Sequence, residues 1–197
     1  MNSPHQNLDD FDRVYNKKRG NVLFPPLTLT TIAAGVLQKV KEVEVEILDM
    51  EFEIMKFFNE NDKSPISPKE FMKSKINSKL NKFKPDIVGL SLLFSQAHPN
   101  SFIIAKLTKE NNPNTKVVCG GNHATFAHKR MLEQCPSIDF IFLHEADNTF
   151  PAFLEYLKGN VKFKDLKGIA WLDKTTNKVR AAAAAEKINN LDTLPIP

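Results

Sequence analysis

The sequence predicts an α/β protein built around a doubly wound parallel sheet. Four short runs of apolar, β-branched or aromatic residues, at 43–50, 86–93, 115–121 and 139–146, have the composition of strands that are buried on both faces of a sheet. Segments with helical periodicity separate these runs, and strands that alternate with helices are joined by right-handed crossovers. The expected strand order is 2-1-3-4-5, as in flavodoxin-like (Rossmann-like) sheets.

The first 40 residues are expected to supply one strand and one helix. Residues 1–4, "MNSP", have the character of a strand end, so we expect the first strand to be truncated at the start of this chain. Apolar residues recur from Leu29 to Val40 at i, i+3, i+4, i+7, i+8 and i+11, and Pro25-Pro26 and Thr28 precede them as helix-start signals. This spacing predicts a helix with one buried stripe.

Four further helices are expected along the chain. Three of them separate the predicted strands, at 70–83, 97–110 and 124–134. The last covers 150–157, has apolar residues at i, i+3, i+4 and i+7, and ends at Gly159. On this basis we assign residues 1–160 to one α/β domain.

The residues after 160 follow a different pattern. The stretch "LKGIAWLDKTTNKVRA" has two strand-like halves around a polar turn, which predicts a β-hairpin extension over 161–188. The proline-punctuated "NNLDTLPIP" at 189–197 is typical of a linker. We therefore expect a further domain to follow it.

Composition excludes several classes of protein. The net charge of +4 arises from 27 basic and 23 acidic residues spread along the chain, which favours solvated helix surfaces over a nucleic-acid-binding patch. No signal-peptide pattern and no apolar run of about 18 residues is present, so no membrane partner is expected. Cys119 and Cys135 lack CxxC spacing, which indicates reduced thiols in a cytoplasmic protein.

The stretch "VVCGGNHATF" at 117–126 is the first candidate for a binding site. It changes abruptly from a buried strand to a helix at Gly120 and Gly121, where a backbone without Cβ atoms can approach a bulky ligand. Such loops lie at the carboxyl ends of strands, where open α/β sheets bind ligands. Walker A and GxGxxG patterns are absent, which disfavours phosphate binding. A tight turn that needs glycine only for its geometry remains the alternative.

An ordered set of motifs resembles a known family. The segments "NSP", "PPLTLTTIAAGVL", "KPDIVGLSLL", "VVCGGNHAT", "DFIFLHEADNTF", "LKGIAW" and "LDTLPIP" together are similar to the N-terminal cobalamin-binding domain of cobalamin-dependent radical SAM enzymes. The resemblance covers the whole chain in order and ends where the radical SAM domain of that family would begin. It implies cobalamin (vitamin B12) as the cofactor.

The resemblance also implies which residues contact the cofactor. They come from the loops after the first, third, fourth and fifth predicted strands: Ser3, Pro4, His5, Ser91, Leu92, Ser95, Gly120, Gly121, Asn122, His123, Thr125 and Glu145. Glu145 matches the glutamate of the family's "GE" turn, although His144 stands where the family has glycine. As an alternative, Glu145 is a residue near the start of a helix, where a carboxylate interacts favourably with the helix dipole.

Histidines require separate consideration because cobalt accepts imidazole as a ligand. Related cobalamin modules carry Asp-x-His-x-x-Gly after the first strand, and this chain has "SPHQNL" at that position. His5 is in place, but the carboxylate that would orient it and the glycine are absent. We therefore expect base-off cobalamin without a metal ligand from the protein. His98 and His128 are interpreted as surface or helix-packing residues.

The predicted function is that of a cobalamin-binding module. The chain lacks the CxxxCxxC cysteines that hold a [4Fe-4S] cluster, so we expect no catalytic residues in it. The resemblance implies a C-terminal radical SAM domain in the same polypeptide, with S-adenosylmethionine, the cluster and a small-molecule substrate, as in methylcobalamin-dependent C-methyltransferases or related cyclases. Two alternatives are a cobalamin-free binding or interaction domain of this fold, and a flavin- or nucleotide-binding protein, which would lack a phosphate loop.

Overall fold

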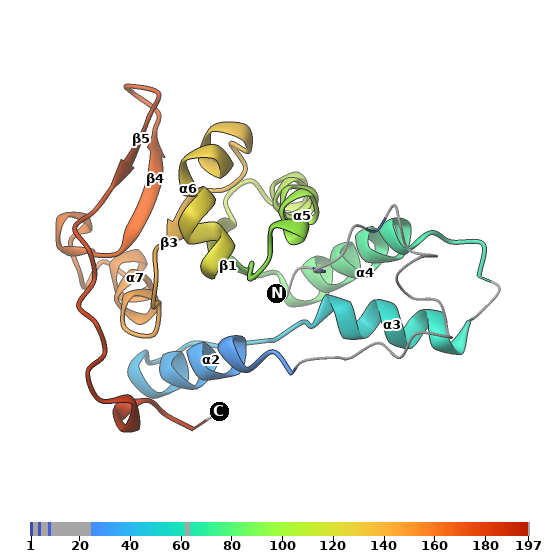
Figure 1. Ribbon diagram of the computed structural model, residues 1–197, viewed down its shortest axis with the longest axis horizontal. Coiled ribbons are helices and arrows are strands. Elements are labelled where there is room, and N and C mark those ends of the chain that lie inside the picture. The colour runs from blue at the N-terminus through green and yellow to red at the C-terminus, as the bar shows by residue number, and fades with distance from the viewer. Residues whose placement is uncertain (2–3, 5–7, 9–24, 62–63, 197) are drawn as a thin grey trace.

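The protein folds around a single five-stranded mixed sheet. The computed structural model describes residues 1, 4, 8, 25–61 and 64–196. The sheet has the order β1-β2-β3-β4-β5, in which β1, β2 and β3 are parallel and β4 and β5 are antiparallel to their neighbours (Figure 1). The strands are β1 (Ile87–Ser91), β2 (Lys116–Gly120), β3 (Phe140–Phe142), β4 (Ile169–Asp173) and β5 (Lys178–Ala181).

Helices cover both faces of the sheet, which confirms the predicted fold class. They are α2 (Leu27–Lys39), α3 (Met50–Glu60), α4 (Pro68–Phe83), α5 (His98–Asn111), α6 (Asn122–Gln134) and α7 (Thr149–Leu157). Five of them match the predicted helices to within two residues at each end, as the periodic apolar spacing requires.

The burial of β2 explains why the sequence of a central parallel strand is a continuous run of apolar residues. Val117 and Cys119 belong to one core together with Ile104 of α5 and Met131 of α6. Val118, between them, points to the opposite face and packs in a second core with Phe153 of α7. Since successive side chains of a strand alternate between faces, both faces of β2 need apolar residues.

The prediction of a strand at 43–50 is wrong. Residues 43–48 are extended but form no strand ladder within the described part of the chain; Asp49 makes a single bridge. Asp49 then caps α3, because its carboxylate accepts hydrogen bonds from the backbone N–H groups of Glu51 and Phe52. The alternating "VEVEIL" has strand composition, but a strand also needs a neighbour to pair with, and composition does not supply one.

The edge of β1 carries the start of the chain. The N–H of Ser91 donates to the carbonyl of Met1 at 3.0 Å, and the amino group of Met1 contacts the carbonyl of Gly89. Burial lowers the pKa of this amino group to about 6. The strand β1 corresponds to the third predicted strand. The hydrogen bonds of Met1 place it on the side of β1 where the predicted order 2-1-3-4-5 puts the first strand. A small hollow of about 70 Å³ lies between β1 and the extended segment, with Glu46 and Leu48 in its lining.

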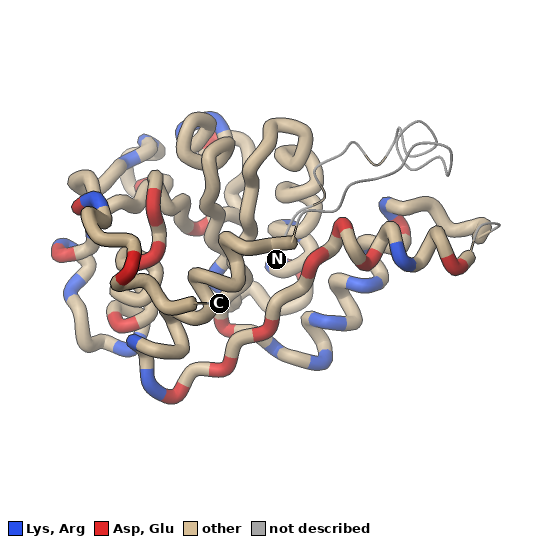
Figure 2. The backbone as a smooth tube through the Cα atoms, turned by 60° about the horizontal axis from the view of Figure 1, so that its bottom comes forward, with Lys and Arg blue, Asp and Glu red and all other residues tan. Residues whose placement is uncertain are grey.

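The basic stretch of α4 lies beside acidic residues rather than forming an isolated patch. Lys75 forms an ion pair of 2.8 Å with Glu53, and Lys79 pairs with Glu46. Figure 2 shows the two opposite charges side by side along α3, α4 and the extended segment that precedes α3. This arrangement agrees with a solvated helix surface.

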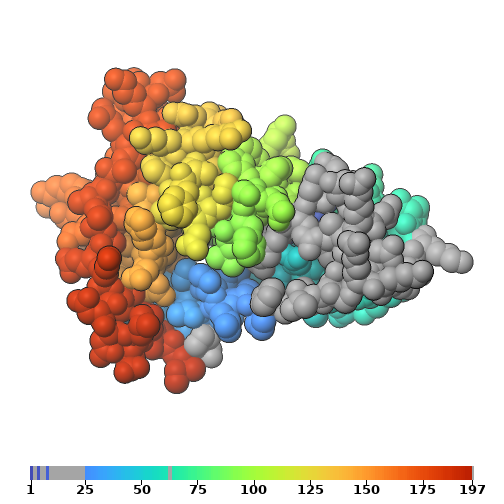
Figure 3. Space-filling model, viewed as in Figure 1, coloured from blue at the N-terminus to red at the C-terminus, as the bar shows by residue number. Residues whose placement is uncertain are grey.

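The predicted hairpin is confirmed and extends the sheet. Trp171 of β4 is opposite Arg180 of β5, and β4 also pairs with β3 through Ile169 and Phe142. The chain after β5 runs past α7 toward α2 (Figures 1 and 3). In the described part of the chain, no helix has the length and apolar character to cross a membrane.

Candidate functional site

Three loops meet at the carboxyl ends of the parallel strands. The N–H of Leu92, after β1, donates to the carbonyl of Gly120 at 2.8 Å, and the carbonyl of Leu92 accepts from the N–H of His123 at 3.1 Å. The hydroxyl oxygen of Thr125 accepts from the N–H of His144, after β3, at 3.0 Å. Backbone and side-chain hydrogen bonds thus join the loops after β1, β2 and β3 into one edge, which we call the carboxyl edge.

The two glycines of the turn have different roles. Gly121 has φ 101° and ψ 171°, a conformation that is essentially restricted to glycine. A Cβ atom at this position would lie 2.5 Å from the carbonyl oxygen of Leu92. A Cβ atom on Gly120 would meet only the Cβ of Phe142, at an ordinary 3.8 Å. The geometric alternative therefore accounts for Gly121, which brings the β1 and β2 loops together.

His98 and His123 form a pair across these loops. The Nδ1 of His98 lies 2.8 Å from the Nε2 of His123, and both side chains are half-buried. The His98 ring also contacts the ring of Phe102, with 4.5 Å between centroids. Loss of hydration lowers the pKa of both imidazoles, and His123 and Arg130 lower that of His98 further. These shifts favour the neutral form of both rings at pH 7.

The sequence interpretation of His98 as a surface or helix-packing residue missed this pair. His98 is the first residue of α5. Its partner, His123, is the second residue of α6, which starts at Asn122. The only signal in the sequence was its place in the loop "SLLFSQAH" directly after a predicted strand.

The other predicted site residues differ in accessibility. Ser91 and Leu92 are buried, whereas Ser95 and Asn122 are exposed at the starts of a 3-10 turn and of α6. Pro4 is buried, and its carbonyl accepts a hydrogen bond of 3.1 Å from the side chain of Asn100. Ser3 and His5 lie outside the described residues.

Glu145 is exposed but its carboxylate has a protein partner. It accepts a hydrogen bond of 3.2 Å from the backbone N–H of Ile188, in the tail after β5. The tail is also held by the N–H of Gly168, which donates to the carbonyl of Ala183 at 2.7 Å. Glu145 thus ties the tail to the loop after β3, whereas its predicted contact with the cofactor stays a prediction.

The two thiols are structural. Cys119 and Cys135 are buried and free, and burial raises the pKa of both thiols, so neither forms a reactive thiolate at pH 7. The described residues contain no group of three or more histidine, cysteine, aspartate or glutamate side chains that could hold a metal ion. Beside the Glu145 carboxylate, the carboxyl edge presents uncharged hydrogen-bonding groups: two imidazoles, the Ser95 hydroxyl and the Asn122 amide.

The family model of the B12 binding domain matches residues 21–154. An uncharacterized methyltransferase from Pyrococcus horikoshii is 33% identical over 174 residues, which is 88% of this chain and 33% of that protein. The chain thus spans about a third of the length of this curated relative.

Two solved structures share the fold. The cobalamin-dependent S-adenosylmethionine radical enzyme OxsB, with aqua-cobalamin and S-adenosylmethionine bound, superposes with a TM-score of 0.68 at 24% identity, over 88% of this chain and 21% of that one. The radical S-adenosylmethionine methyltransferase TsrM from Kitasatospora setae, with cobalamin and a [4Fe-4S] cluster bound, superposes with a TM-score of 0.64 at 13% identity, over 88% and 28%.

Proposed function

Because the chain belongs to the B12-binding domain family, we propose that its carboxyl edge holds cobalamin. The observation that carries this proposal is the joining of three loops at the carboxyl ends of β1, β2 and β3, where doubly wound sheets bind their ligands. The family match includes all three loops. It favours cobalamin binding over the cobalamin-free alternative.

The residues of the edge divide into those that shape it and those that contact the ligand. Leu92 and Gly121 shape it through their close backbone contact. Ser95, Asn122 and the histidine pair present polar groups that are partly or fully exposed. When bound, cobalamin supplies a cobalt centre that can carry a methyl group, and the protein's task is to orient the corrin ring.

The parent enzyme is proposed from the relatives. The methyltransferase relative is about three times the length of the matched part, and both structural neighbours are named as radical S-adenosylmethionine proteins. We infer a C-terminal radical SAM domain after the linker 189–197, which would hold S-adenosylmethionine and the [4Fe-4S] cluster. The whole cytoplasmic enzyme would methylate or cyclise a small-molecule substrate. A CxxxCxxC motif in the reading frame beyond Pro197 would support this inference.

The cofactor test is a titration of the purified protein with hydroxocobalamin, followed by absorbance and equilibrium dialysis. We expect one cobalamin per chain. A protein that remains folded but takes up none would contradict the proposal and support the cobalamin-free alternative.

Cobalt coordination is a separate prediction. We propose that no nitrogen of this chain coordinates cobalt, because Ser3 cannot supply the carboxylate that would orient His5. The His5→Ala variant should therefore leave the electron paramagnetic resonance spectrum of bound cobalt(II) unchanged. If the wild-type spectrum carries nitrogen splitting that this substitution removes, His5 is a ligand.

A further inference from the structure

The outer edge of β1 is only partly paired. The N–H of Leu92 bonds to the end of β2. On the opposite side of the strand, the carbonyl of Gly89 and the N–H of Ser91 bond to Met1. Because the backbone groups of a parallel strand point to alternate sides, the N–H of Gly89 and both backbone groups of Ile87 also point outward. These three groups have no hydrogen-bond partner among the residues that the structure describes.

The two bonds of Met1 define a parallel register with β1. Its amino group contacts the carbonyl of Gly89, and its carbonyl accepts from the N–H of Ser91, as expected for a residue opposite Leu90 in a parallel pair. A backbone that continued back from Met1 in this register would follow β1 toward its start. The residue two positions before Met1 would accept from the free N–H of Gly89 and donate to the free carbonyl of Ile87.

The extended segment 43–48 faces the same edge. Val43 packs in one cluster with Ile87, at the start of β1. Burial lowers the pKa of the Met1 amino group to about 6, an effect that the nearby charge of Asp49 partly offsets. Since one end of the segment is near the start of β1 and the other is near Met1, the segment runs in the same direction as β1. The hollow between them is not enclosed, and we call this place the edge slot.

The edge slot borders apolar clusters on both faces of the sheet. Met1 packs against the larger core, which includes Leu48 and Val88. Ile87 packs on the other face, against the cluster formed by α2 and α7. Because the side chains of a strand alternate between faces, a strand in the slot would need apolar residues at successive positions.

We propose that the edge slot takes a parallel strand of about five apolar residues, which precedes Met1 in the polypeptide and pairs with both β1 and segment 43–48. The segment 43–48 would thereby gain the neighbour that its strand composition requires. A peptide bond at Met1 also suits the slot, because its N–H can still donate to the carbonyl of Gly89 while no charge has to be buried. The proposal is independent of the ligand at the carboxyl edge.

Amide hydrogen exchange of the present chain tests whether the edge is open. The amides of Val88 and Leu90 face β2 and should exchange at least about tenfold more slowly than the amide of Gly89. Equal protection of Gly89 would show that the edge is already paired and would overturn the proposal. If this protection increases with protein concentration, the edge is covered by a second copy of the chain instead.

An added strand tests the occupant. The segment Lys-Val-Val-Leu-Val, fused directly before Met1, should slow exchange at the Gly89 amide about tenfold or more and raise the urea midpoint of unfolding. Alternate amides of 43–48 should be slowed as well, because the segment gains a partner. The matched control, Lys-Val-Val-Pro-Val, has proline two positions before Met1, where no N–H is then available for the carbonyl of Ile87. Identical exchange and midpoints in the two fusions would overturn the proposal, whatever the result of the cobalamin titration.

Acetylation of Met1 provides a second test if the fused protein does not fold. The acetyl group supplies the first peptide bond of the proposed strand. In the unmodified chain, the unfolded state binds more protons than the folded state between about pH 6 and 8, so the urea midpoint should rise over this range. The acetylated chain should lack this contribution and have the higher midpoint at pH 6. A lower midpoint after acetylation would show that the slot rejects a peptide bond at Met1 and would overturn the proposal.

Discussion

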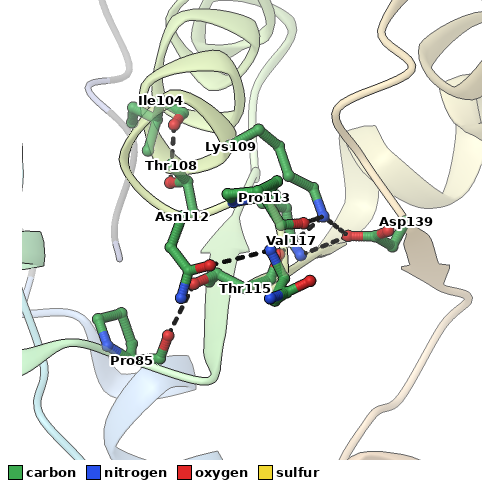
Figure 4. Close-up of polar contacts among 10 residues, drawn as sticks. Pro85, Ile104, Thr108, Lys109, Asn112, Pro113, Thr115, Val117 and Asp139 are labelled. Carbon is green, nitrogen blue, oxygen red and sulfur yellow. Dashed lines mark hydrogen bonds and ion pairs between the residues drawn. The ribbon is translucent and has the colours of Figure 1, made fainter.

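The two ends of the same parallel strands use polar residues in opposite ways. At the amino ends, Lys109 lies 2.7 Å from the carboxylate of Asp139 and 2.7 Å from the carbonyl of Thr115, so its charge is fully engaged (Figure 4). At the carboxyl ends, His98 and His123 each engage one ring nitrogen within the part of the chain that the structure describes. Polar groups that satisfy one another hold the fold together, whereas groups left open are available to a ligand.

The amino-end network connects four elements. The carboxylate of Asp139 accepts from the N–H of Val117 at 2.8 Å, and the N–H of Asp139 donates to the carbonyl of Val117 at 2.8 Å. The hydroxyl of Thr115 donates to the carbonyl of Pro85 at 2.8 Å. The end of α5 and the starts of β1, β2 and β3 are thereby fixed relative to one another, which gives the loops at the opposite ends a rigid base.

The largest expected effect is at Gly121, whose backbone conformation shapes the carboxyl edge. Gly121→Ala should lower the free energy of unfolding by about 3 kcal/mol, because it adds backbone strain and a clash with the carbonyl of Leu92. Urea denaturation measures the change. Gly120→Ala is the control and should cost about 1 kcal/mol or less. Equal effects of the two substitutions would show that the conformation of the turn is not the constraint.

The second-largest effect on stability is expected at the amino ends of the parallel strands. Asp139→Ala should lower the free energy of unfolding by about 2 kcal/mol, because the N–H of Val117 and the charge of Lys109 lose a partner that is 17% exposed. The affinity of the Asp139→Ala variant for hydroxocobalamin should equal that of the wild type. Glu110→Ala, which removes an exposed ion pair of 3.8 Å with Lys106, should change stability by less than about 0.5 kcal/mol. A large loss of cobalamin affinity in folded Asp139→Ala would remove the distinction between the two ends.

The smallest effect is expected at Glu145. Glu145→Ala removes one exposed hydrogen bond to the N–H of Ile188 and should change stability by less than about 0.5 kcal/mol. Hydrogen exchange at the Ile188 amide should become faster, and Glu155→Ala on α7 should leave it unchanged. If Glu145→Ala instead weakens cobalamin binding about tenfold, the role implied by the family resemblance is restored and Glu145 joins the site.

The local residue pattern was sufficient to predict most helices and strands, but not to predict which distant segments of the chain pair with each other. Five helices and the parallel strands follow from spacing and two-sided burial, which the sequence of each element records, whereas α3 was not predicted. The segment 43–48 has the same composition as a strand, yet the structure gives it no ladder within the described residues. Pairing depends on a neighbour from elsewhere in the chain, so composition alone predicted a strand where the described residues form no ladder.

The same limit applies to the site. Gly120, Gly121 and His123 could be singled out because a strand, a glycine turn and a helix follow one another locally. The role of His98 could not, because its partner is 25 positions away and is brought to it by the crossover between β1 and β2. Glu145 was matched by its motif, but the contact with Ile188 depends on the path of a tail that follows the hairpin.

The most direct test of the cobalamin site maps the ligand onto the two ends of the strands. Amide proton–nitrogen NMR spectra of the protein, recorded during titration with hydroxocobalamin, report each backbone N–H. Binding at the carboxyl edge predicts shifts in the loops 92–98, 120–125 and 143–148, with the amides of Thr115, Val117 and Asp139 unchanged. Shifts centred on the amino ends, or no shifts at saturating hydroxocobalamin, would contradict the account.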